Sequence, residues 1–188
     1  MSRTAFPSAT RETRPPARWA SLAAHLVPLT VLPSGLWRIA LALGFSMGML
    51  EDGGPVAVHG WLSVYVLSLS VVSEGTALLT LGLVRPWGER VPAWVPRLGG
   101  RRIPPRPVVV IAAIGAVTLG AIWGYAFRDP TLPGIEFSHR GWYILIVACY
   151  APLLLWAPLL AAVTYDYHRR HATPAATAAA GESVLEAA

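Results

Sequence analysis

Four long apolar stretches limit what this chain can fold into. They cover residues 27–50, 61–84, 108–127 and 142–165. Each is long enough to cross a hydrocarbon core of about 30 Å as an α-helix, which takes about 20 residues. A membrane β-barrel would instead alternate apolar and polar residues in segments of about 10, and these stretches do not alternate. The predicted fold class is therefore an all-α membrane protein, a bundle of four transmembrane helices.

The composition agrees with that fold class. Hydrophobic residues make up 54% of the chain and charged residues 13%, against about 25% charged in an average globular chain. The mean hydropathy is +0.50. A chain this apolar is neither a soluble domain nor a disordered one. Its basic excess, all of it arginine, is explained by loops at a membrane surface, so we predict no nucleic-acid partner.

The distribution of charge predicts how the helices are oriented. Residues 1–18 carry four arginines and one acidic residue, and residues 85–107 carry six arginines and one acidic residue. Residues 51–60 carry two acidic residues and no arginine, and residues 128–141 carry two of each sign. Arginine-rich loops stay in the cytoplasm. We therefore expect a multi-pass protein of the plasma membrane with both termini and the second loop cytoplasmic.

The predicted spans and the charge distribution divide the chain into three regions. Residues 1–18 are expected to form a cytoplasmic tail, residues 19–170 the membrane domain, and residues 171–188, which are rich in alanine, a disordered tail. The first apolar run is longer than the 7–15 residues of a signal-peptide core, so we expect an uncleaved first helix.

Prolines are expected to shape the first helix. Pro28 and Pro33 interrupt its apolar run, and an internal proline removes a backbone hydrogen bond and kinks a helix. We expect an interfacial lead-in over residues 19–25, followed by a span centred near Arg38.

The second loop combines arginine, tryptophan and proline. Tryptophan settles at the membrane interface and arginine pairs with anionic lipid headgroups. We predict that the loop lies on such headgroups, with a docking site for a cytoplasmic partner as the alternative. Its basic and aromatic residues are Arg85, Trp87, Arg90, Trp94, Arg97, Arg101, Arg102 and Arg106.

Two charged residues lie inside the predicted spans, Arg38 in the first and Glu74 in the second. A charge in the bilayer core costs about 2.5–3.5 kcal/mol on insertion scales, so such residues face the bundle interior and find a partner. Ser63, Ser70 and Glu74 share one stripe of the second helix, which should face protein. We hypothesise that Arg38 and Glu74 form a buried pair. The pair either fixes the register of the two helices or has a role in binding a substrate or transferring a proton.

Two further helices carry packing signals. A stripe of small residues lets two helices approach closely, and the third helix has such a stripe at every fourth position: Ala112, Ala116, Gly120 and Gly124. In the fourth helix, Pro152 and Pro158 predict a bend.

Known catalytic and metal-binding motifs are missing from the sequence. There is no Gly-x-Ser-x-Gly, His-Glu-x-x-His or phosphate-loop motif. His168 and His171 with Asp166 have a spacing that binds metal weakly, but their arginine neighbours are more typical of an interfacial anchor. We predict no metal site and no cofactor, and Glu74 is the one candidate for a catalytic residue.

Four segments together resemble a family of small actinobacterial integral membrane proteins. They are residues 33–38 (PSGLWR), 73–92 (SEGTALLTLGLVRPWGERVP), 98–105 (LGGRRIPP) and 149–159 (CYAPLLLWAPL). The resemblance covers residues 32–170. It implies a four-helix membrane protein, and it implies no activity and no catalytic residue.

Three function classes fit these observations. We favour a non-enzymatic membrane component or accessory subunit. The first alternative is a small proton-coupled transporter that uses Glu74, which would require a homo-oligomer because four helices leave little room for an internal pathway. The second alternative is an intramembrane enzyme acting on a lipid or isoprenoid, with Glu74 as general acid.

Overall fold

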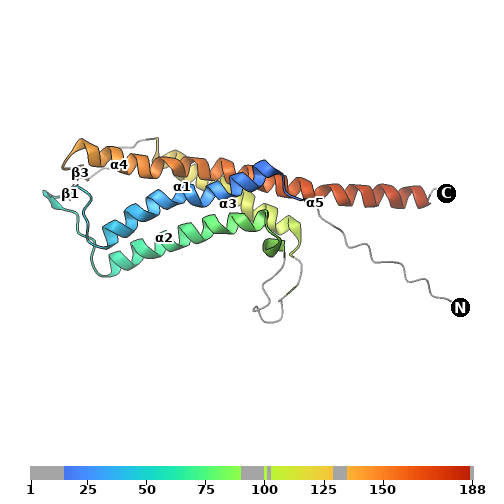
Figure 1. Cartoon of the computed structure of the whole chain (residues 1–188), viewed down its shortest axis with the longest axis horizontal. Helices are drawn as coiled ribbons and strands as arrows, with labels where there is room; N and C mark the ends of the chain where they lie inside the picture. Colours follow the sequence, from blue (N-terminus) through green and yellow to red (C-terminus); the bar gives the residue numbers. More distant parts are fainter. Residues whose placement is uncertain (1–14, 90–99, 101–102, 129–134, 187–188) are drawn as a thin grey trace.

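The computed structural model describes residues 15–89, 100, 103–128 and 135–186 and is mainly helical (Figure 1). The α-helices are α1 (Arg18–Ala42), α2 (Trp61–Leu79), α3 (Pro105–Ala126), α4 (Arg140–Tyr150) and α5 (Trp156–Glu186). Three short 3-10 helices connect them: η1 (Thr80–Leu83), η2 (Pro86–Glu89) and η3 (Ala151–Leu155).

Four helical segments within the described residues are long and apolar enough to cross a membrane. They are Arg18–Ala42, Trp61–Leu83, Pro105–Ala126 and Arg140–Ala172. The prediction of a mainly helical chain with four such segments is confirmed.

The first span ends earlier than predicted. Helix α1 stops at Ala42 instead of residue 50, because Gly44, Met47 and Gly48 adopt positive φ angles of 94°, 52° and 71° that end a helix. The expected lead-in does not form either, since α1 runs as one helix from Arg18 through both internal prolines. Arg38 consequently lies four residues before the end of α1 and not at its centre.

The fourth span is interrupted where the sequence predicted a bend. Helix α4 gives way to η3 at Ala151–Leu155, which contains Pro152, and α5 then begins at Trp156. Helix α5 continues to Glu186, although the sequence predicted disorder from residue 171. Alanine has the strongest helix propensity of all residues, which accounts for this difference.

The helices run back and forth between two ends of the molecule. Helix α1 begins and α5 ends at the same end, where α2 is also connected to α3 (Figure 1). The connections from α1 to α2 and from α3 to α4 lie at the opposite end. This alternation agrees with the alternating arginine content of the connecting segments.

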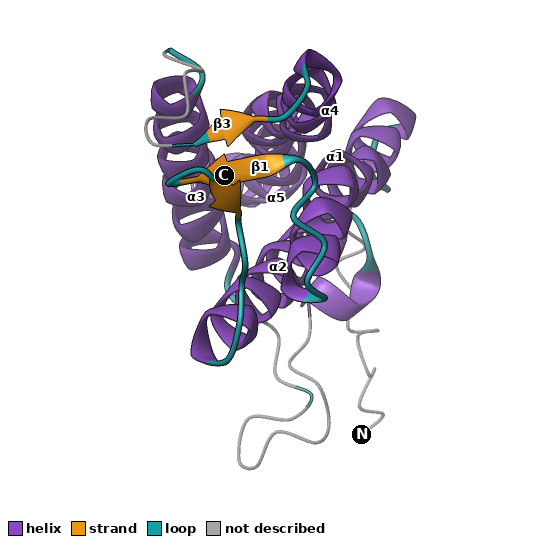
Figure 2. Ribbon diagram, turned by 90° about the vertical axis from the view of Figure 1, so that its left-hand side faces the viewer, coloured by secondary structure: helices purple, strands orange, loops and turns teal. Residues whose placement is uncertain are grey.

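Helix α1 lies at the centre of the packing. It contacts α2 on one side and α4 and α5 on the other, and α5 in turn packs on α3 (Figure 2). The core includes Val27 and Val31 of α1 and Val163 and Tyr167 of α5, all of them almost completely buried. Because α2 packs mainly on α1 and α3 mainly on α5, these two helices form the edges of the bundle.

Helix α1 buries several small residues while its leucines point outward. Ala20, Ala24 and Ser34 of α1 are completely buried, whereas Leu22 and Leu29 of the same helix are 63% and 60% exposed. A water-soluble helix has the opposite arrangement. Inward small residues are typical of helices that meet lipid on their outer faces and each other through close backbone contact.

A small antiparallel sheet that the sequence did not predict joins two connections at one end of the bundle (Figure 2). Its order is β2 (Gly54–Pro55), β1 (Met49–Glu51) and β3 (Glu136–Phe137). The sheet ties the α1–α2 connection to the segment before α4, and the Ser138 amide extends it by donating to the Gly48 carbonyl at 2.8 Å.

Aromatic side chains fasten this end to the helices. Trp37 of α1 meets Trp142 of α4 edge to face, with ring centroids 6.5 Å apart. Gly48 lies so close to Trp142 that a Cβ atom at this position would overlap the indole ring. The glycine is therefore required both by its positive φ and by its neighbour.

Candidate functional site

Arg38 extends the buried face of α1 and is itself 8% exposed. Its Nε donates a hydrogen bond to the Ser70 hydroxyl of α2 at 3.1 Å. Ser70 is satisfied on both sides, because its own hydroxyl donates to the Val66 carbonyl at 3.0 Å. The Nη2 atom of Arg38 is buried and has no hydrogen-bond partner. A charged side chain thus bridges α1 and α2 from the core side of α1.

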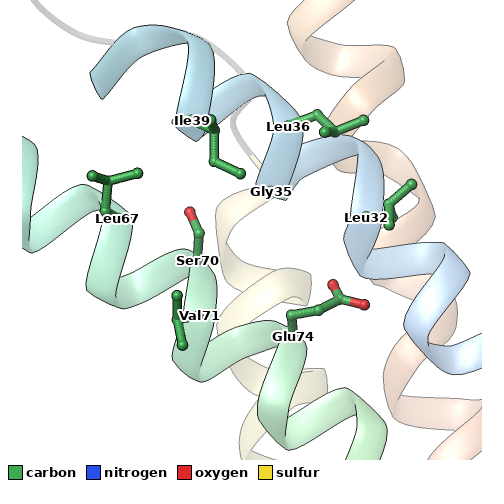
Figure 3. Close-up of a pocket in the computed structure, with 8 residues that line it drawn as sticks. All are labelled: Leu32, Gly35, Leu36, Ile39, Leu67, Ser70, Val71 and Glu74. Atoms are coloured by element: carbon green, nitrogen blue, oxygen red, sulfur yellow. The ribbon is translucent and has the colours of Figure 1, made fainter. Parts of the chain in front are cut away.

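Glu74 lies one helical turn beyond Ser70 and faces a groove between α1 and α2 of about 250 Å³. The carboxylate sits at one end of the groove, close to Leu32, while Ile39 and Leu67 lie at the other end (Figure 3). The walls are almost entirely apolar. The groove is lined by Leu32, Gly35, Leu36, Ile39, Leu67, Ser70, Val71 and Glu74.

The expected ion pair between Arg38 and Glu74 is not formed in this structure. Within the described residues no ion pair within 4.0 Å joins them, and Arg38 bonds to Ser70 instead. The reason is geometric: Arg38 does not line the groove that Glu74 faces. The two residues share an interface but approach it from different sides.

Tyr150 of α4 is a further aromatic side chain with a polar group that packs against the core, and sequence reasoning did not single it out. The Tyr150 ring contacts Trp123 of α3 with centroids 6.1 Å apart. The only sequence signal was the position of Tyr150 beside the bend at Pro152.

The small residues of α3 pack within the chain. Ala116 is buried, Ala112 packs against the hydrophobic core, and a Cβ on Gly120 would lie 3.5 Å from the Ala157 methyl of α5. A Cβ on Gly124 would meet nothing within 4 Å. Three of the four positions of the stripe thus pack against the core or against α5.

Part of the basic loop is attached to the bundle. The Arg85 Nη2 lies 3.2 Å from the His25 Nε2, while the His25 Nδ1 lies 2.7 Å from the Ser21 carbonyl. A guanidinium only donates hydrogen bonds, so the His25 Nε2 is the acceptor and its Nδ1 the donor. Trp87 is half exposed, and Arg106 is exposed in the first turn of α3. The remaining predicted loop residues lie outside the described residues: Arg90, Trp94, Arg97, Arg101 and Arg102.

Asp166, whose spacing from His168 and His171 is that of a weak metal site, has a different partner. Asp166 accepts a hydrogen bond from the Arg170 Nε at 2.9 Å, and both side chains are buried. His171 Nδ1 lies 2.8 Å from the Tyr167 carbonyl, and the two rings stack with centroids 4.2 Å apart. In the part of the chain that the structure describes, no three His, Cys, Asp or Glu side chains gather as metal ligands.

Comparisons of the chain with protein-family models, with curated proteins and with solved structures found no match. Function is therefore inferred from the geometry of Arg38, Ser70, Glu74 and the groove.

Proposed function

We propose that this chain is a multi-pass protein of the plasma membrane and a non-enzymatic accessory subunit of a membrane complex. Four apolar helical segments and the concentration of arginine at one end of the bundle support this location, with that end in the cytoplasm. The helix ends that carry both termini lie at this arginine-rich end.

The observation that carries the proposal is the carboxylate of Glu74. It opens into an apolar groove and has no hydrogen bond or ion pair among the described residues. A charged side chain within a bilayer costs about 2.5–3.5 kcal/mol on insertion scales, and it normally meets protein or a water-filled cavity. A partner that covers the groove and donates to Glu74 removes this cost. The groove is therefore the contact site of the accessory subunit.

Photo-crosslinking in native membranes tests this assignment. A photoreactive amino acid at Val71, which lines the groove and is 72% exposed, should yield a discrete adduct with another protein. The matched control is Val117 on the outer face of α3, which is 73% exposed and should yield lipid adducts alone. A Val71 position that captures only lipid would contradict the proposal.

A small proton-coupled transporter is the second candidate, favoured by the same carboxyl group, which has no hydrogen bond or ion pair among the described residues. In that case the protein reconstituted in liposomes would move protons together with a solute, and Glu74→Gln would abolish this flux. An accessory subunit alone would show no flux in either form.

A further inference from the structure

We infer that the groove between α1 and α2 receives a transmembrane helix that carries one basic side chain, lysine or arginine, directed at Glu74. This inference rests on the proposed accessory role and names the chemistry of the partner. It follows from the shape of the groove, from the position of Arg38 and from the depth of Glu74 along α2.

The shape of the groove suits the side chains of a third helix. Leu32, Leu36 and Ile39 of α1 and Leu67 and Val71 of α2 line it. Gly35 leaves a hollow between them, because a Cβ there would meet nothing within 4 Å. Packed helices lie about 8–10 Å apart, with the ridges of one entering the grooves of another. A volume of about 250 Å³ holds a few side chains, which is what such a helix would insert.

The polar group that an occupant meets is the carboxyl of Glu74, which has no hydrogen bond or ion pair among the described residues. Arg38 is 8% exposed, does not line the groove and donates to Ser70. The occupant therefore contacts the carboxylate without contacting the guanidinium. An unpaired charge in a membrane is costly whether it lies on this chain or on its partner. A basic partner residue and Glu74 therefore compensate each other.

The depth of Glu74 favours a protein helix over a lipid. At 1.5 Å per residue, Glu74 lies about 20 Å from the start and about 14 Å from the end of the span Trp61–Leu83. Both distances place it inside a hydrocarbon layer of about 30 Å. Acyl chains offer no hydrogen-bond donor at this depth, whereas a transmembrane helix can place a lysine there.

Two synthetic helices that differ at one position provide the test. Both are leucine-rich and long enough to span the bilayer; one carries a central lysine and the other a central methionine of similar length. Binding to the full chain in lipid vesicles is followed by energy transfer between fluorophores. The lysine helix should bind about tenfold more tightly, the size of a modest charge-pair coupling. Glu74→Gln, which keeps the shape of the side chain, should abolish this preference.

Two glycine variants separate shape from charge. Gly35→Leu fills the groove and should weaken binding of both helices, while Gly124→Leu, also with open space around its Cβ but on α3, should leave binding unchanged. Equal binding of the two helices to the wild-type protein, or a lysine preference that survives Glu74→Gln, would overturn the inference. A protein adduct at Val71 without a lysine preference would leave the accessory role standing and refute only the partner chemistry.

Discussion

Arg170 connects two segments that are 87 positions apart in the chain. Its Nη2 donates to the Leu83 carbonyl at the end of η1 at 2.7 Å, and its Nε donates to the Asp166 carboxylate at 2.9 Å. The guanidinium also lies over the Tyr167 ring, 5.5 Å from its centroid. These contacts join the end of η1, which follows α2, to α5.

Replacing Arg170 with methionine should destabilise the protein strongly. The change leaves the buried Asp166 carboxylate without its partner, and breaking a buried pair typically costs about 3–5 kcal/mol. Thermal unfolding of the detergent-solubilised protein measures the loss. Arg169→Met is the control, because Arg169 is exposed and contacts the exposed Tyr165 ring. Equal effects of the two substitutions would contradict the role of Arg170.

Removing the Ser70 hydroxyl should also be costly. Ser70→Ala deprives the buried Arg38 Nε of its acceptor, and an unsatisfied buried polar group costs about 1–3 kcal/mol. Ser68→Ala is the matched control on the same helix, since this exposed hydroxyl bonds only to its own helix at the Tyr65 carbonyl. Denaturation of both variants should show a loss for Ser70 alone. A loss of similar size for Ser68 would indicate a general effect of serine in α2.

Two glycines in the α1–α2 connection distinguish local strain from contact with Trp142. Gly48 and Gly53 both have positive φ, 71° and 78°, so alanine at either position costs about 1–2 kcal/mol. Gly48→Ala additionally drives a methyl group into the Trp142 ring, whereas Gly53 has open space around it. Gly48→Ala should therefore lower the melting temperature more and alter the near-ultraviolet circular dichroism of the tryptophans. Identical behaviour of the two variants would show that Gly48 and Trp142 do not pack together.

The sequence predicts the helices well and their contacts poorly. Apolar run length indicates four spans, and Pro152 indicates the break in the last one. The three strands have only two or three residues each, too few for an alternating pattern to appear. Positive φ at Gly44 and Gly48, which ends the first span early, is also not visible in an apolar run.

The partner of Arg38 could not be predicted for a different reason. Ser70 and Glu74 lie on the same stripe of α2, one turn apart, and either could meet a residue of α1. The choice depends on the rotation and offset of the two helices, which are set by the packing of Ala20, Ala24 and Val27 against the rest of the bundle. Periodicity alone indicates the polar stripe and leaves its partner open.

Thiol labelling in intact cells tests most directly the claim that the chain crosses the membrane four times with both ends inside. In a Cys149→Ala background, Gly54→Cys should react with a membrane-impermeant reagent, because Gly54 lies in the sheet at the end opposite the start of α1 and the end of α5. Ser2→Cys, Ala93→Cys and Ala176→Cys should react only after the cells are permeabilised. Labelling of Ala93→Cys from outside, or protection of Gly54→Cys, would contradict the four-span orientation.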